Sequence, residues 1–242
     1  MKALVDDNRF DLDPRQRAAR DRARAVAAQA EAFADEADAC REVHVASRDL
    51  LKSSGLVRHT VPAAYGGASE SLDPLTIAVI REALMYTSAH LDSLFGMQGV
   101  GSYPVTVGGS ERLRRTWLPR VAALEAIPAI ALTEPEVGSD LRAVSTTIDR
   151  TAGGLVVNGR KSFITNGGVA DFYCVLGREG DGYSMVLVPA DTPGLRVEAG
   201  PDLISPHILG ELVFDDVVVP EGNRLGEPGN AFRLMLQTLA VF

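Results

Sequence analysis

The residues with the clearest potential for chemistry lie in the segment 130–140, IALTEPEVGSD. An apolar run ends there in a hydroxyl, an acid, a proline and a Gly-Ser-Asp turn. A strand that ends in such a loop exposes successive backbone N–H groups, and concave backbone of this kind binds phosphate or carbonyl oxygens. The same residue types also form ordinary turns. Taken alone, the segment predicts either a loop whose backbone N–H groups bind the oxygen atoms of a phosphate or carbonyl group, or a plain turn.

Other motifs with a known mechanism are missing from the sequence. It has no G-x-G-x-x-G, no G-x-x-x-x-G-K-[ST] and no G-x-S-x-G, so we expect no Rossmann site, no P-loop and no hydrolase elbow. The four histidines lack metal-ligand spacing, and Cys40 and Cys174 form no C-x-x-C pair, so we expect no zinc site. We expect both cysteines to be core thiols rather than a disulfide.

The elements that position these residues change character near residue 125. The first half is helical in pattern, and an aspartate followed by proline marks two helix starts, at 13–14 and 73–74. Apolar residues then recur at spacings of three and four through residue 37, which predicts one long first helix. A second helix is expected over 41–54, before a glycine, and another begins near 110.

The second half contains short runs rich in β-branched residues, separated by glycine-containing turns, which is typical of a small antiparallel sheet. Asn158-Gly159 between two such runs predicts a hairpin with a tight primed turn. We therefore predict an α+β fold. It comprises an N-terminal α-helical domain (1–125), a small antiparallel β-barrel or sandwich domain (126–228) and the start of a C-terminal helical domain (229–242).

Composition and charge narrow the class of partner. The chain has 242 residues, 46% of them hydrophobic and 23% charged, which is the balance of a globular protein with a buried core. The formal charge is -8, which gives no general attraction for nucleic acid. No apolar stretch approaches the roughly 20 residues of a membrane span, so we expect no membrane segment and a cytoplasmic location.

Two longer motifs carry a resemblance to a known family. Residues 131–135 (ALTEP) with 138–140 (GSD), followed by 158–167 (NGRKSFITNG), are similar in order and spacing to the two flavin-contacting signatures of the acyl-CoA dehydrogenases. The similarity extends from about residue 15 to the end, so the sequence is identified as a member of this family. The family fold has a helical domain, a middle β domain and a C-terminal helical bundle, of which the bundle is expected to be absent here.

The resemblance implies an FAD site and its residues. Leu132 and Thr133 would lie near the pyrimidine edge of the flavin, where amide or hydroxyl donors stabilise charge on the reduced ring. Phe163 would cover one flavin face where many members carry tryptophan, and Thr165 would lie beside N5. The complete set of implied cofactor contacts is Ile130, Leu132, Thr133, Gly138, Ser139, Phe163, Ile164 and Thr165, and Ser139 would also contact the pantetheine arm of the substrate.

The implied reaction is α,β-dehydrogenation of an acyl thioester, an oxidation within fatty acid metabolism. A carboxylate base removes the α proton while the β hydrogen leaves as hydride to the flavin. In the family that base comes from the C-terminal bundle, so no residue of this sequence is predicted to be catalytic. Glu134 matches a position that is not the base, and we expect it to order its own loop. We expect the bundle to be encoded beyond Phe242 or supplied by a partner subunit.

Two departures from the family pattern affect the substrate carrier. Residues 200–206 (GPDLISP) offer no cation where relatives that use coenzyme A often carry a basic stretch, and Glu179 replaces a small hydroxyl residue near the coenzyme. Both changes reduce the attraction for the phosphate-rich nucleotide of coenzyme A. We therefore expect the substrate to be either an acyl-CoA or an acyl group on a carrier protein.

Two alternatives to a dehydrogenase stay open from the sequence. The first is a non-catalytic binding or scaffold subunit of the same fold, and the second is a flavin-dependent monooxygenase relative. We expect a homo-oligomer, or a hetero-oligomer with a chain that supplies the bundle, and the electron acceptor is not predicted. The apolar tail from residue 231 supports an oligomer, because it has too many apolar residues for a free surface helix.

Overall fold

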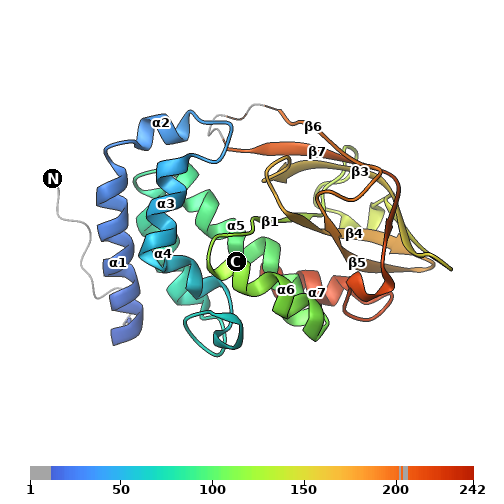
Figure 1. Ribbon diagram of the computed structural model, residues 1–242, viewed down its shortest axis with the longest axis horizontal. Coiled ribbons are helices and arrows are strands. Elements are labelled where there is room, and N and C mark those ends of the chain that lie inside the picture. The colour runs from blue at the N-terminus through green and yellow to red at the C-terminus, as the bar shows by residue number, and fades with distance from the viewer. Residues whose placement is uncertain (1–11, 202, 204–206) are drawn as a thin grey trace.

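The computed structural model describes residues 12–201, 203 and 207–242. Figure 1 shows the helices grouped on one side, the strands on the other, and a last helix beside the sheet. The helices are α1 (Pro14–Ala30), α2 (Ala34–Asp38), α3 (Val45–Ser54), α4 (Pro74–Met85), α5 (Ala89–Gly108), α6 (Glu111–Ala122) and α7 (Ala231–Leu239). None of the helices in the described part of the chain has the length and apolar character to cross a membrane.

Most helices begin where the sequence offers a capping side chain. The Asp13 carboxylate accepts hydrogen bonds from the backbone N–H groups of Arg15 and Gln16, at 2.7 and 2.9 Å, and the Asp13 N–H donates to the Gln16 side chain. Asp73 and Ser110 cap α4 and α6 in a similar way. Because each cap satisfies a backbone donor that the helix leaves unpaired, these starts were predictable from residue type.

Two helix predictions need correction. The long first helix is broken after Ala30, and α2 follows as a separate short helix. The helix expected over 41–54 begins only at Val45, although it ends as predicted at Gly55, which takes a left-handed φ of 71°. His44 explains the later start, because its ring accepts a hydrogen bond from the Ser47 N–H and caps the first turn.

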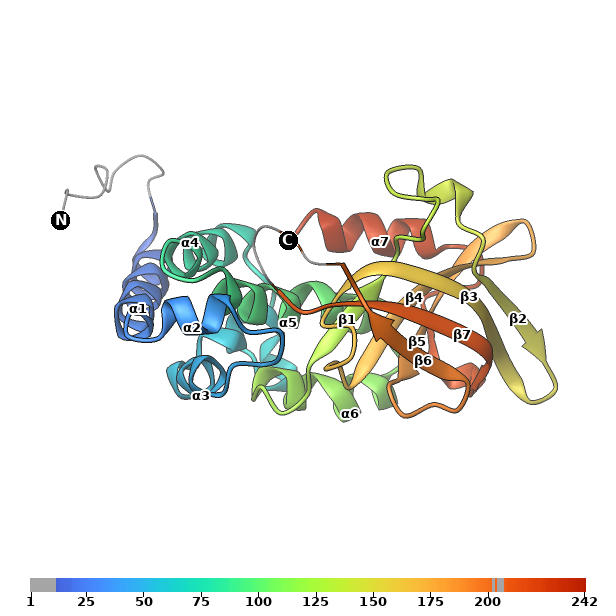
Figure 2. The same ribbon diagram turned by 90° about the horizontal axis from the view of Figure 1, so that it is seen from above.

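The central helix α5 has no counterpart in the sequence-based prediction. It spans 20 residues, yet it contains four glycines and Pro104, residue types that disfavour helix. It forms because it packs on all sides, against α4, α6, α7 and β1. At Gly101 the approach is so close that a Cβ atom would lie 2.8 Å from the carbonyl carbon of Pro128, so only glycine fits there. Figure 2 shows α5 between the other helices and the strands.

The sheet has eight strands and is mixed rather than purely antiparallel. The strands are β1 (Pro128–Ala131), β2 (Thr147–Thr151), β3 (Gly154–Thr165), β4 (Phe172–Glu179), β5 (Gly182–Pro189), β6 (Leu195–Ala199), β7 (Leu209–Val219) and β8 (Arg224–Leu225). Their order is β6-β7-β3-β2-β4-β5-β8, and β1 pairs with β4. Both β1 and β2 run parallel to β4. The α+β class is thus confirmed, with parallel pairs that the hairpin-like spacing did not reveal.

The hairpin predicted at Asn158-Gly159 is wrong. β3 runs without a turn from Gly154 to Thr165, and the turn that precedes it lies at residues 152–153. Gly159 instead marks a register shift in the pairing of β3 with β7. A Cβ at Gly159 would lie 2.5 Å from the Thr146 hydroxyl oxygen, so the glycine permits a close approach of backbone rather than a tight turn.

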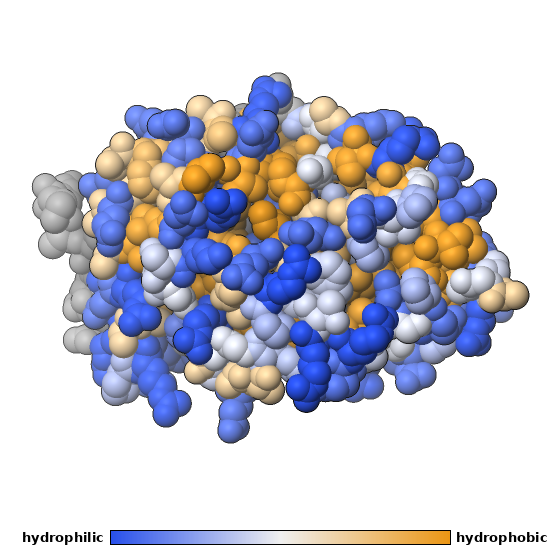
Figure 3. All heavy atoms as spheres, in the orientation of Figure 1, coloured by the Kyte–Doolittle hydropathy of each residue, from blue (hydrophilic) through white to orange (hydrophobic). Residues whose placement is uncertain are grey.

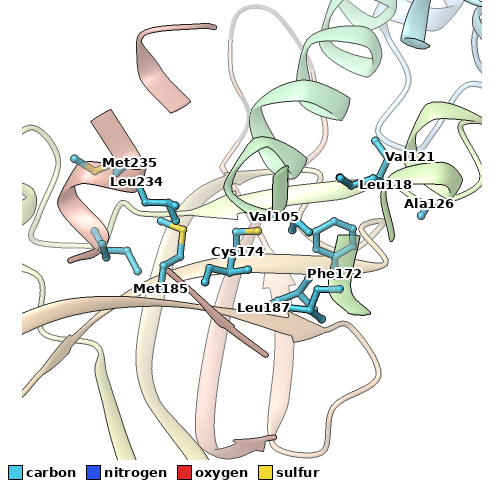
Figure 4. Close-up of a cluster of buried hydrophobic side chains, with 14 of the residues drawn as sticks. Val105, Leu118, Val121, Ala126, Phe172, Cys174, Met185, Leu187, Leu234 and Met235 are labelled. Carbon is cyan, nitrogen blue, oxygen red and sulfur yellow. The ribbon is translucent and has the colours of Figure 1, made fainter. Parts of the chain in front are cut away.

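The face seen in Figure 3 carries hydrophilic side chains with hydrophobic ones exposed between them. Inside the molecule, the helices and the sheet share a continuous apolar core (Figure 4). One cluster joins Val105 of α5 and Leu118 of α6 to Phe172 and Cys174 of β4 and to Leu234 of α7. Cys174 is fully buried and free, as is expected of a core thiol, and burial raises its pKa. Cys40 is also free but only partly buried, so the prediction of a core thiol is wrong there. This shared core holds α5 rigidly against the end of the sheet, where the candidate site lies.

Candidate functional site

The loop between β1 and β2 is held from inside by the carboxylate of Glu134. One oxygen accepts hydrogen bonds from the N–H and the hydroxyl of Ser145, both at 2.7 Å, and the other accepts from the Thr146 N–H at 2.9 Å. Glu134 and Val137 also exchange backbone hydrogen bonds across a narrow turn. Glu134 therefore orders its own loop, as expected, and it does not face solvent.

A buried lysine completes this arrangement. Lys161 of β3 donates from Nζ to Glu134 Oε1 and to the Leu132 carbonyl oxygen, both at 2.9 Å, and the two charged side chains are 0% and 2% exposed. Burial lowers the pKa of Lys161 to about 8, although its bond to Glu134 opposes this. Burial alone would raise the pKa of Glu134, but its hydrogen-bond donors outweigh this effect and lower the pKa to about 2. The ion pair thus joins both sequence motifs at one point.

The second motif contains a bulge that turns one aromatic ring outward. Lys161 pairs with Leu212, but Ile164 pairs with Gly210, so β3 has one extra residue here. Phe163 occupies the bulge with a positive φ of 58°, which is rare for a large side chain, and it remains 53% exposed. Such backbone strain costs about 1–3 kcal/mol and is concentrated at functional sites. The bulge therefore displays a flat apolar ring at the surface.

The same bulge directs Ile164 inward. Its side chain is 2% exposed and belongs to the core between the strands, with Leu212 and Phe214 of β7. Only its backbone remains available to a ligand. The expectation that Ile164 contacts the cofactor is therefore restricted to main-chain contact.

Thr165, the last residue of β3, lies at a cavity of about 350 Å³ between the sheet and the helices. The other lining residues come mainly from α4 and α5, and the complete lining is Arg81, Met85, Ala89, Asp92, Ser93, Gly96, Met97, Val100, Thr165 and His207. A pocket of this size lies at the small end of the roughly 300–1,000 Å³ range of ligand sites. Thr165 thus brings a hydroxyl to a cavity that a small ligand fits.

The remaining predicted cofactor contacts lie in one continuous segment, residues 130–139. Ile130 and Leu132 are half-buried against the core cluster around Phe172. The carbonyl of Thr133 accepts a hydrogen bond from the Ser162 N–H at 2.9 Å, which joins the two motifs a second time. Gly138 and Ser139 are exposed on the turn that follows.

One polar atom beside these motifs lacks a partner. The Ser162 hydroxyl is buried, yet it has no hydrogen bond within the described part of the chain. Buried polar groups are nearly always satisfied, so an orphan of this kind indicates a missing partner. Together with the outward ring of Phe163 and the hydroxyl of Thr165, it makes these residues a fitting site for a flat aromatic cofactor with polar edges.

Glu179 does not present a free negative charge, contrary to the expectation from its residue type. Its carboxylate is bound by the guanidinium of Arg224, with one contact of 2.8 Å, and it also accepts from Ser184. The bond to Arg224 lowers the pKa of Glu179. Because the negative charge is compensated, Glu179 does not repel a nearby phosphate as its residue type suggested. Of the cation-poor segment 200–206, positions 202 and 204–206 lie outside the described residues.

Two features of the site were missed at the sequence level. Lys161 follows Leu155, Val157 and Gly159 at intervals of two, so alternation along the strand placed it on the buried face, and this signal was available. The contribution of α5, through Asp92 and neighbouring residues, was hidden because the helix itself was not predicted.

Comparison with known proteins shows to which family the chain belongs. Residues 13–125 match the model of the acyl-CoA dehydrogenase N-terminal domain, and residues 129–217 match that of the acyl-CoA dehydrogenase middle domain. The fold and the two matches thus define a chain with the helical and middle domains of this class. The chain belongs to the acyl-CoA dehydrogenase family.

Two relatives and one solved structure illustrate the similarity. The chain is 34% identical over 206 residues to a cyclohexane-1-carbonyl-CoA dehydrogenase of Geobacter metallireducens, covering 83% of this chain and 54% of that protein. It is 37% identical over 202 residues to a cyclohex-1-ene-1-carbonyl-CoA dehydrogenase of the same organism, covering 80% and 53%. An acyl-CoA dehydrogenase complexed with FAD from Bacillus anthracis superimposes with a TM-score of 0.83 at 27% identity, covering 96% of this chain and 41% of that one. The chain therefore spans about half the length of the curated relatives it matches.

Proposed function

We propose that this chain forms the flavin-binding part of an FAD-dependent enzyme that introduces an α,β double bond into an acyl thioester. The observation that carries the proposal is the linkage of the two motifs by Lys161 and Glu134, which places the backbone of Leu132 and Thr133 beside the β3 bulge. Bound FAD would supply the acceptor for the hydride that leaves the β carbon. The solved structure of a relative with FAD supports this choice of cofactor.

Each residue has a defined task in this proposal. The backbone of Leu132 and Thr133 would hold the polar edge of the ring, while the Thr165 hydroxyl would orient the edge that faces the cavity. Phe163 would cover one face of the ring and exclude water. Ser139, on its exposed turn, would contact the pantetheine arm of the substrate.

The base is not assigned to a residue of this chain. Asp92 lines the same cavity as Thr165, but both of its oxygens accept hydrogen bonds from Arg81. Both carboxylate oxygens are therefore directed at Arg81 rather than at a ligand in the cavity. We propose that the base is a carboxylate of the C-terminal helical domain that the family carries.

We propose coenzyme A as the carrier of the acyl group. Arg142 and Arg178 are exposed, and neither guanidinium has a carboxylate partner within the described residues. Both lie beside Tyr183, since the Tyr183 hydroxyl donates to the Arg142 carbonyl at 2.6 Å and the Arg178 guanidinium is 5.7 Å from the Tyr183 ring centroid. These cations would bind the phosphates of the nucleotide end. The relatives named as CoA dehydrogenases support the same choice.

The domain organisation and the exposed face of α7 bear on the oligomeric state. We propose that residues 1–125, 126–228 and 229–242 act as helical domain, middle domain and start of a C-terminal domain. Leu236 and Leu239 of α7 are more than half exposed, and the C-terminal domain or a second copy of the chain would cover them. We propose a cytoplasmic homo-oligomer.

The decisive experiment is an FAD titration of the protein expressed from its complete gene, followed through the flavin spectrum. We expect tight binding, then bleaching of the flavin when an acyl-CoA is added without an electron acceptor. Thr165→Ala and Phe163→Ala should slow bleaching. Val45→Ala, which shortens a similarly exposed apolar side chain at the start of α3, away from the cavity, should not. Failure to bind FAD would refute the proposal. Binding without bleaching would favour a scaffold subunit, and rapid oxygen consumption with a reductase would favour a monooxygenase.

A further inference from the structure

The cavity at Thr165 is separated from a second cavity by a wall of few residues. The second cavity, of about 310 Å³, lies between α4 and the last two residues of the chain. Its lining is Pro74, Ile77, Ala78, Arg81, Glu82, Met85, Asp92, Val241 and Phe242. Both cavities share Arg81, Met85 and Asp92. These three side chains therefore lie between the two spaces, and removing them would connect the two.

The wall is built around an ion pair between a half-buried arginine and a buried aspartate. Arg81 of α4 donates from Nε and Nη2 to the two oxygens of Asp92 on α5, at 3.0 and 2.8 Å. The Asp92 side chain is 2% exposed and that of Arg81 is 36% exposed. A two-point contact of this kind fixes both side chains in one orientation, so the wall is rigid and not a mobile side chain that a ligand pushes aside.

Gly96 makes room for this pair. A Cβ atom at Gly96 would lie 3.1 Å from Arg81 Nε and 3.2 Å from the guanidinium carbon. The guanidinium plane thus lies directly on the backbone of α5, one turn beyond Asp92. Any larger residue at this position would move the guanidinium, so the small residue and the ion pair form one unit.

The wall also has a polar face. Nη1 of Arg81 has no hydrogen-bond partner within the described residues, and Ser93 lines the same cavity. The pair as a whole is neutral, so it offers donors without a net charge. A long alkyl chain would meet two charged groups at this wall and would have to displace them from each other. This is costly, because the Asp92 carboxylate would stay buried without its partner.

We propose that the Arg81–Asp92 pair ends the acyl-binding cavity and restricts the substrate to short or compact acyl groups. This inference rests on the proposed function, because it takes the space beside Thr165 as the place of the acyl group. Arg81 and Asp92 act here as specificity-determining residues and take no part in proton or hydride transfer.

The test compares two double variants of the protein expressed from its complete gene. Arg81→Ala with Asp92→Ala opens the wall, whereas Arg81→Met with Asp92→Leu removes the charges but keeps the volume. Removing both partners together avoids an uncompensated buried charge, which is the change that most often prevents folding. Arg196→Ala with Asp215→Ala removes an exposed ion pair of the sheet and serves as the matched control.

For each protein, kcat/KM is measured with the butanoyl, octanoyl and dodecanoyl thioesters of coenzyme A, and the dissociation constants are measured by calorimetry. We expect the opened variant to raise the octanoyl-to-butanoyl ratio of kcat/KM by about tenfold or more, since one methylene in an apolar pocket is worth about 10–200-fold. The volume-keeping variant and the surface control should retain the butanoyl preference. An unchanged profile in an opened variant that binds FAD and turns over butanoyl-CoA would overturn the inference. A wild-type protein that turns over none of the thioesters would instead overturn the proposed function.

Discussion

Replacing Lys161 by methionine is the sharpest test of how the two motifs are held together. Methionine keeps most of the length of the side chain and removes the charge. The Glu134 carboxylate then stays buried without its ion-pair partner, and the Leu132 carbonyl loses its donor. Breaking a buried pair on one side costs about 3–5 kcal/mol. Because Ser145 and Thr146 still donate to Glu134, we expect a loss of about 3 kcal/mol, at the lower end of that range.

The assay is urea unfolding followed by fluorescence. The chain has one tryptophan, Trp117 of α6, and its ring centroid lies 4.6 Å from that of Phe172 on β4, so its emission reports on the junction of helices and sheet. Lys52→Met is the control, since Lys52 pairs with Glu125 at 3.6 Å with both side chains about half exposed. Such a surface pair is worth less than about 1 kcal/mol.

The double variant Lys161→Met with Glu134→Gln separates the ion pair from simple packing. It removes both charges, so its loss of stability should be smaller than the sum of the two single losses by about 1–3 kcal/mol. If the two single effects were additive, or if Lys161→Met cost no more than Lys52→Met, then the buried ion pair would not hold the loop, and the reasoning would be refuted.

Three further predictions address other parts of the molecule. Gly101→Ala should lower the free energy of unfolding by about 1–3 kcal/mol or prevent folding, because its Cβ would overlap the backbone of β1; circular dichroism with urea measures this. Burial, and then the neighbouring His44, lowers the pKa of His90, so the unfolded chain binds the proton more readily and stability should fall as the pH drops below 6.5. The difference in unfolding free energy between wild type and His90→Gln across this window checks the sign, and a difference independent of pH would contradict it. Arg142→Ala with Arg178→Ala should raise KM for an acyl-CoA about tenfold with kcat unchanged, and an equal KM would exclude a phosphate contact.

Local signals in the sequence were sufficient for the outline of the fold. The caps at Asp13 and Asp73 and the glycine at 55 determine helix ends through hydrogen bonds within a few residues, so residue type alone predicts them. The start of the sheet near residue 127 follows from the change in residue types. The strands that pair in parallel were not predictable in this way, because β1 and β4 meet across a long stretch of chain.

The site was predictable in its residue types but not in its construction. Thr165 and Phe163 were identified by resemblance, whereas the bulge that exposes Phe163 and buries Ile164 depends on the register of β3 against β7. Asn158-Gly159 has the residue types of a tight turn, but here Gly159 permits close packing against Thr146. The helix α5 was not predicted because its glycines indicate a low helix propensity. They are required by close contacts with segments distant in the sequence, which helix propensity does not take into account.

The composition of α5 also determines how the chain loses its structure. Each glycine in a helix costs about 1 kcal/mol relative to alanine, so a helix with four of them is not stable by itself. Its order depends at once on α4, on β1 and on the segment before α7, where Gly226 N–H donates to the Gly108 carbonyl at 2.8 Å. We therefore expect the helical and sheet halves to unfold in one cooperative transition rather than in two. A ligand that binds at either half should consequently protect the amide hydrogens of both halves from exchange with solvent.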